Sequence, residues 1–207
     1  MTNRSQVLWG VAVTVAVFVV STLALFAMDA APTARAVAKQ AERVERLDAE
    51  RDIDGVACMT RVSYYQDGRL RSCVLARDTV FPNGLELPKG TQVGFDAGGA
   101  PERAFLPANL VFDGHHCIGT GTHDAMTNFH PNGRLRFCNL AQVEVINGVP
   151  CQRSSFWIWI TQGGAGTYFH DNGALQECLL ADDATVGGEV FRKRDHLRLD
   201  RDGTPLK

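Results

Sequence analysis

The chain begins with a long run of apolar positions that no charged residue interrupts. Residues 7–28 read VLWGVAVTVAVFVVSTLALFAM, which is 22 positions. As a helix rising about 1.5 Å per residue, this run would measure roughly 33 Å, enough to cross a hydrocarbon core. The pattern predicts a membrane-spanning helix and disfavours a buried core helix, which would need a polar face.

A cleaved signal peptide is the alternative interpretation of the same segment. The apolar core of a signal peptide has about 7–15 residues, so this run is long for one. An Ala-x-Ala cleavage site nevertheless follows at Ala34-Arg35-Ala36. We expect residues 1–28 to form an uncleaved signal-anchor and keep cleavage as the alternative. More basic residues follow the span than precede it, which weakly favours a cytoplasmic C-terminal part.

A polar segment rich in Ala, Glu and Arg follows the span. Its apolar positions form only a narrow stripe of small residues, Ala34, Val37, Ala41 and Val44. A stripe this narrow cannot support a domain of its own. We therefore expect residues 29–52 to be a helical stalk or linker, with a weak coiled coil as the alternative.

From residue 53 the pattern changes to a repeat built from two alternating elements. The first element is an apolar residue, Asp or Asn, Gly, two residues, and then an apolar residue or Cys. The second is an aromatic residue followed by [DN]-G-x-L-x-x-C-x-L-A. Clear copies of the first stand at 53–58, 112–117 and 146–151, and clear copies of the second at 64–76, 129–141 and 169–181.

Degenerate copies complete the array, which is long enough to build a β-repeat domain over residues 53–207. They stand at 83–87, 95–108, 187–191 and 199–206. Five units are predicted, at approximately 53–80, 81–111, 112–145, 146–185 and 186–207. Each unit is too small to bury its own apolar face, so neighbouring units must cover one another.

The repeat predicts an all-β fold, an antiparallel meander of about five hairpin units. Asn-Gly and Asp-Gly favour two-residue turns in which both central residues have positive φ. Strict alternation after Gly68 would place Leu70 on one face and Cys73 and Leu75 on the other. The equivalent leucines of four units are expected to stack as a core ladder: Leu75, Leu106, Leu140 and Leu180.

The six cysteines follow the repeat in a way that predicts their pairing. Each complete unit has one cysteine in its first element and one in its second. Unit two has neither, because Leu87 and Ala104 stand at those positions. Presence and absence match only for pairing within a unit. The predicted disulfides are Cys58–Cys73, Cys117–Cys138 and Cys151–Cys178.

Disulfides persist in oxidising compartments, so the repeat region is expected in the periplasm or outside the cell. This argument outweighs the weak count of basic residues around the span. The alternative is a cytoplasm-facing repeat protein whose six cysteines are reduced and act as small buried hydrophobes.

Composition and motifs argue against catalysis and against nucleic-acid binding. The net charge of −2 provides no basic footprint for nucleic acid. The usual hydrolase, zinc-protease and phosphate-loop motifs are missing from the sequence. We expect no catalytic residue, metal or cofactor; the alternative is a metal-dependent or hydrolytic enzyme that uses the histidine-bearing turns. The histidines are His115, His116, His123, His130, His170 and His196.

The longest insertion carries a dense aromatic run, Phe156-Trp157-Ile158-Trp159-Ile160. Its β-branched and aromatic residues favour a strand buried on both faces. The alternative is an exposed patch that binds a partner through Phe156, Trp157 and Trp159, since exposed aromatic patches usually mark binding sites.

The run Tyr64-Tyr65-Gln66-Asp67-Gly68-Arg69-Leu70 resembles the Y-Y-x-N-G-x-L core of bacterial MORN-variant repeats, and residues 129–135 and 169–175 share the resemblance. The resemblance implies a sheet of hairpins used for structure or interaction, with motif residues that are scaffold. Together these observations predict a non-catalytic, single-pass protein of the cell membrane whose repeat domain binds or supports envelope components. An envelope protein or another surface ligand is the expected partner.

Overall fold

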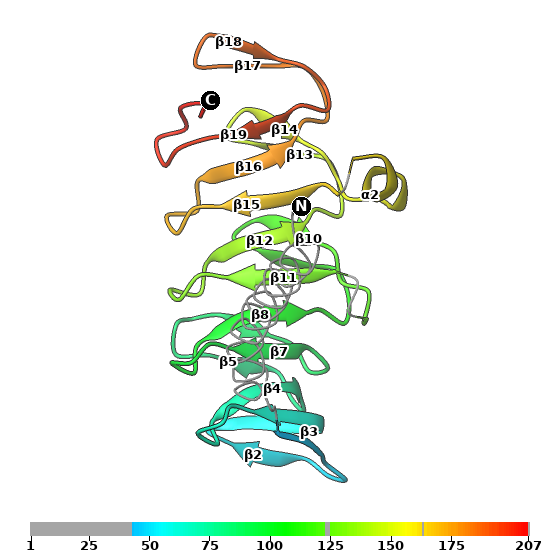
Figure 1. The fold of residues 1–207 in the computed structure, drawn as a ribbon, viewed down its shortest axis with the longest axis vertical. Coiled ribbons are helices and arrows are strands. Elements are labelled where there is room, and N and C mark those ends of the chain that lie inside the picture. The colour runs from blue at the N-terminus through cyan, green and yellow to red at the C-terminus, as the bar shows by residue number, and fades with distance from the viewer. Residues whose placement is uncertain (1–42, 123–124, 163, 207) are drawn as a thin grey trace, which may run out of the picture. The chain divides into compact units, whose positions relative to one another are not determined.

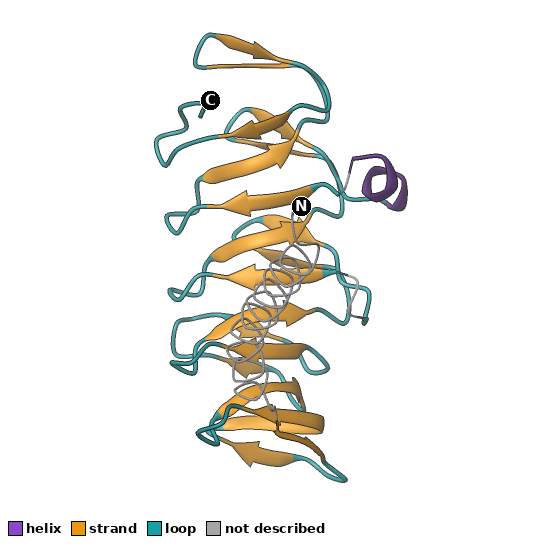
Figure 2. Ribbon diagram, viewed as in Figure 1, coloured by secondary structure: helices purple, strands orange, loops and turns teal. Residues whose placement is uncertain are grey.

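The computed structural model describes residues 43–122, 125–162 and 164–206, and this part of the chain is almost entirely β-structure (Figure 1 and Figure 2). It belongs to one unit that starts at Arg43. The expected signal-anchor at 1–28 and most of the expected stalk lie outside the described residues. Within the described ranges, no helix has the length and apolarity needed to cross a membrane.

The predicted antiparallel meander is confirmed. Among the described residues, eleven strands form one sheet in which the strands follow one another in chain order (Figure 1). The path runs through β1 (Arg43–Arg46), β3 (Val56–Tyr64), β4 (Leu70–Leu75), β7 (Gln92–Phe95), β8 (Pro101–Phe105), β11 (Met126–Phe129), β12 (Leu135–Asn139), β15 (Gly166–Phe169), β16 (Leu175–Leu179) and β19 (His196–Arg198). The eleventh strand, β2 (Arg51–Ile53), pairs with the first part of β3.

Each first element of the repeat forms a short hairpin beside this main sheet. These side hairpins are β5 (Thr79–Val80) with β6 (Glu86–Leu87), β9 (Leu110–Phe112) with β10 (His115–Cys117), β13 (Glu144–Ile146) with β14 (Val149–Cys151), and β17 (Ala184–Val186) with β18 (Glu189–Phe191). In the first unit, β2 and the start of β3 take the same role.

The core lies between the side hairpins and the main sheet. Phe112 on β9 meets Phe129 on β11 edge-to-face, with ring centroids 5.1 Å apart. The leucines of the predicted ladder are confirmed as core residues, because all four are completely buried in one cluster: Leu75, Leu106, Leu140 and Leu180. Since one cluster contains leucines of four units, the units share a single core rather than four separate ones.

The predicted two-residue turns are confirmed between β2 and β3, β9 and β10, β13 and β14, and β17 and β18. They are wrong in the loops formed by the second element and in the β5–β6 hairpin, where only Gly84 has positive φ. In the confirmed turns both central residues have positive φ, for example Asn147 at 51° and Gly148 at 82°. In the loops of the main sheet only the glycine has positive φ, as at Gly68. The backbone N–H of Tyr65 donates to the carbonyl of Arg69 and closes a three-residue loop. Such a loop combines a type I turn with one left-handed residue, so a single glycine suffices.

Strict alternation after these loops is also wrong, because each following strand contains a β-bulge. Ser63 pairs with Ser72, but Tyr64 pairs with Leu70, so Arg71 is an extra residue. The bulge shifts the pattern by one position and brings Leu70 to the buried face that Cys73 shares. The equivalent extra residues in later units are Glu102, Arg136 and Gln176.

The predicted helix is wrong for residues 43–52, which form β1, a bend and β2. β1 pairs along β3 from Arg43 opposite Tyr64 to Arg46 opposite Arg61. The helical signal there was a single i,i+4 pair, which is worth only about 0.2–0.5 kcal/mol. Backbone pairing along the edge of a nine-residue strand outweighs it, and the β-region therefore starts at Arg43 rather than at residue 53.

Candidate functional site

All six cysteines are paired as the repeat predicted. The disulfides are Cys58–Cys73, Cys117–Cys138 and Cys151–Cys178, with no free cysteine. Each joins the second strand of a side hairpin, or its equivalent in β3, to a strand of the main sheet. The six sulfur-bearing residues are at most 1% exposed, so these bonds are structural staples shielded from reductants.

Unit two shows which side chains take the place of a disulfide. Leu87 and Ala104 occupy the cysteine positions and are 1% and 0% exposed. A large and a small apolar side chain therefore fill the space of the missing disulfide.

The histidines of the main-sheet loops join neighbouring units. His130 donates its Nε2–H to the carbonyl of Phe169 at 2.9 Å, and His170 donates to the carbonyl of Leu199 at 3.0 Å. Tyr65 holds the same repeat position and donates its hydroxyl to the carbonyl of Phe95 at 2.6 Å. A side chain at this position thus reaches the backbone of the next unit, which is a scaffold role.

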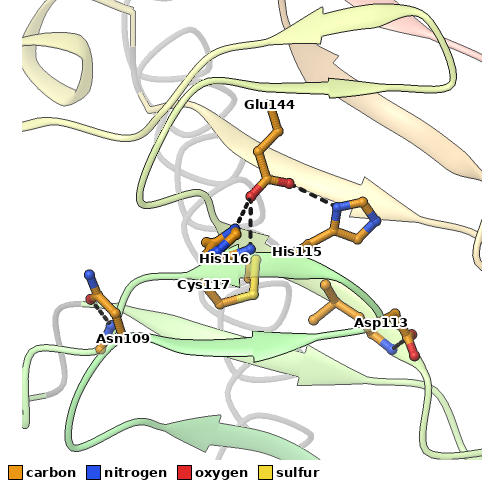
Figure 3. The surroundings of a disulfide bond; sticks show 9 residues. Asn109, Asp113, His115, His116, Cys117 and Glu144 are labelled. Carbon is orange, nitrogen blue, oxygen red and sulfur yellow. Dashed lines mark hydrogen bonds and ion pairs between the residues drawn. A yellow bond between two sulfur atoms is a disulfide. The ribbon is translucent and has the colours of Figure 1, made fainter.

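A second pair of histidines converges on one carboxylate between the side hairpins β9–β10 and β13–β14. Nδ1 of His115 lies 2.9 Å from Oε2 of Glu144, and Nδ1 of His116 lies 2.9 Å from its Oε1 (Figure 3). The backbone N–H of His116 donates to the same Oε1 at 2.8 Å. The His115 ring also stacks on Phe169, with centroids 4.5 Å apart. This His–Glu–His cluster, defined as His115, His116 and Glu144, connects β10 with β13.

The cluster keeps Glu144 ionised although its side chain is only 11% exposed. Burial by itself raises the pKa of this carboxyl. The His116 backbone N–H and the two imidazoles more than compensate, so the pKa lies below its ordinary value. The carboxylate is therefore an anion that accepts the His116 backbone N–H and lies within hydrogen-bond distance of Nδ1 of both rings.

Glu144 was not singled out from the sequence, although the repeat contains a signal for the cluster. His115 stands where the equivalent residues of three other units are buried and apolar, Val56, Leu85 and Val149. A polar residue at a core position requires a buried partner, and Glu144 is that partner.

The described residues contain no group of three or more His, Cys, Asp or Glu side chains arranged to hold a metal ion. His115 and His116 both direct Nδ1 to Glu144, Cys117 is in a disulfide, and His130 and His170 are bonded to carbonyls. His123 lies outside the described residues. The structure does not bring the histidine-bearing turns together into one site.

The aromatic run of the insertion forms a helix, so the predicted strand is wrong. It is α2 (Phe156–Gln162), which lies beside the sheet rather than within it (Figure 2). Trp157 is 73% exposed and Ile160 is 53% exposed. The side chains of Phe156 and Trp159 are outside the described part of the structure. The expected exposed aromatic position thus exists at Trp157, on a helix.

The local sequence explains why this helix stands by itself. β12 pairs directly with β15, which leaves the insertion no place in the sheet. A helix satisfies its own backbone groups. The Ser155 hydroxyl accepts the Ile158 N–H at 3.4 Å, and the Thr161 hydroxyl donates to the Trp157 carbonyl at 2.8 Å.

Comparison of the chain with protein-family models, with curated proteins and with solved structures finds no match.

Proposed function

We propose that this protein is a non-catalytic, membrane-anchored binding or support protein of the cell envelope, with its repeat domain outside the cytoplasm. The observation that carries the proposal is the contrast between a stapled, regular sheet and the exposed apolar side chains of α2. Three buried disulfides make the sheet rigid, and α2 presents Trp157 and Ile160 to the surroundings. Large exposed apolar side chains on a rigid body suit binding.

The disulfides support the proposed compartment. Disulfides form and persist in oxidising compartments, where no cellular reductant acts on the folding chain. The periplasm and the exterior of the cell are compartments of this kind. The apolar run at 7–28 would supply the anchor, and the resemblance to MORN-variant repeats agrees with an interaction or support role.

The test expresses the full chain in a bacterium and blocks thiols at the moment of lysis. Peptide mapping under non-reducing conditions should recover the three predicted cystine peptides. Protease added to spheroplasts should degrade the repeat domain without lysis of the inner membrane. Free thiols at all six positions, or protection of the domain until the inner membrane is opened, would contradict the proposal.

A measurement of metal content distinguishes the proposal from the enzyme alternative. We expect the purified full chain to contain no stoichiometric zinc. One zinc per chain that is lost together with a hydrolytic activity in a His115→Phe variant would make the scaffold interpretation wrong. Tyr65→Phe serves as the control, because it removes a polar contact of the scaffold away from the histidines.

A further inference from the structure

We propose that α2 inserts its exposed face into the boundary between headgroups and hydrocarbon of the membrane that holds the protein. This inference rests on the proposed function, because it requires the chain to be anchored. It names a lipid surface, rather than a protein, as what Trp157 and Ile160 contact.

The segment that contains α2 has the composition expected at a membrane boundary. Residues 154–169 carry no charged side chain, and Arg153, which precedes them, is basic and exposed. Trp is enriched at membrane–water boundaries, where its ring is apolar and its N–H remains hydrated. A basic residue beside an uncharged apolar helix also suits the negative surface of anionic lipids.

α2 forms part of its hydrogen bonds within its own segment. The Ser155 hydroxyl accepts a backbone N–H at the start of the helix, and the Thr161 hydroxyl donates to a carbonyl within it. A segment in which some backbone groups are already bonded loses less on leaving water than an open loop does. A protein partner would not require these internal bonds, because it can supply hydrogen bonds of its own.

The length of chain between the apolar run and β1 also supports the inference. Fourteen residues, 29–42, separate the apolar run from β1, and an extended chain of that length spans at most about 50 Å. Seven strand spacings separate β1 from β15, which follows α2, and at about 4.8 Å each they amount to about 34 Å. An extended tether would therefore be long enough for α2 to reach the membrane in which the chain is anchored.

The test places the full chain in vesicles of phosphatidylcholine and phosphatidylglycerol. Trp9→Phe and Trp159→Phe leave Trp157 as the only tryptophan, because the chain has three. Lipids brominated near the glycerol end of the acyl chain should quench Trp157 emission and shift it to the blue. Adding Ile160→Asp to this protein should abolish both effects.

A matched control places the probe at a side chain of comparable exposure away from α2. Val80 on β5 is 69% exposed, so Val80→Trp in a background with all three native tryptophans replaced by Phe should not be quenched. Equal quenching of both probes would overturn the inference, since it would show non-specific adsorption of the sheet.

The remaining outcomes separate this inference from the proposed function. If the chain floats with the vesicles but Trp157 is not quenched, α2 does not contact lipid and the anchor stands. If the chain does not float with the vesicles, the anchor is wrong and the inference fails with it.

Discussion

At the scale of single residues, the contact between the side hairpins β9–β10 and β13–β14 involves one partly buried anion. Glu144 contacts both imidazoles and one backbone N–H of β10, and its side chain is 11% exposed. Hydrogen bonds to charged groups contribute more than neutral ones because the charge strengthens each bond. His115 would otherwise be a polar ring at a position that is apolar in neighbouring units.

Replacing this carboxylate tests its contribution and the sign of its pH dependence. Glu144→Gln should lower the free energy of unfolding by about 1–3 kcal/mol at neutral pH. The folded pKa of Glu144 is lowered, so its stabilisation is present above the unfolded pKa of about 4.3 and is lost as pH falls through the folded pKa. The gap between wild type and variant should therefore shrink below about pH 4. Thermal unfolding measured from pH 7 to pH 3 gives both results.

Glu177→Gln is the matched control, because Glu177 contacts Arg198 and His196 at the exposed edge strand. Its effect should be smaller than that of Glu144→Gln, as is usual for surface pairs. A gap for Glu144→Gln that widens as the pH falls below 4 would contradict the assignment of Glu144 as the anion of the cluster.

At the scale of elements, the repeat uses two kinds of turn, and each requires glycine at a defined position. The turns of three side hairpins have two consecutive residues with positive φ, whereas the main-sheet loops and the β5–β6 hairpin have only one. A Cβ at Gly148 would meet no atom within 4 Å. Substitution there therefore reports the backbone conformation alone.

Gly148→Ala should destabilise the protein by about 1–2 kcal/mol, because a side chain at φ of 82° strains the backbone. Asn147→Gly is the control: glycine readily adopts the φ of 51° found there, so its effect should be close to zero. Urea unfolding of both variants measures the difference. If Gly148→Ala were as stable as wild type, the turn would not have the conformation described.

At the scale of the whole described region, disulfides and the shared core act together. The units contribute to one apolar core, and three of them are also stapled across it. The staples close segments with sequence separations of 15, 21 and 27 residues. Because loop-closure entropy grows only with the logarithm of length, their contributions should be similar.

Replacing Cys117 and Cys138 with Ala should lower the free energy of unfolding by about 3 kcal/mol, and the same change at Cys151 and Cys178 should cost nearly the same. Replacing Cys117 with Leu and keeping Ala at 138 copies unit two and should recover part of the loss. Denaturant unfolding measures the three proteins. Recovery to wild-type stability would show that packing, rather than the covalent bond, stabilises this unit.

The sequence by itself determined the features that repeat. Units, the turns of three side hairpins, the buried leucines and the disulfide pairing all follow from spacings that recur. The cysteines appear and disappear together within a unit because one bond needs both of them. Because each feature recurs in several units, a real pattern can be distinguished from a chance similarity.

Only the tertiary structure decided the features in which strands or units meet. The bulge at Arg71 depends on how two strands align, and β1 forms because β3 offers it an edge. α2 is a helix although its residues favour a strand, because β12 pairs directly with β15 and leaves the insertion no place in the sheet. His115 and Glu144 lie 29 positions apart in the chain. Their contact exists only once the side hairpins β9–β10 and β13–β14 stack, since no local pattern states which residues of neighbouring hairpins will face each other.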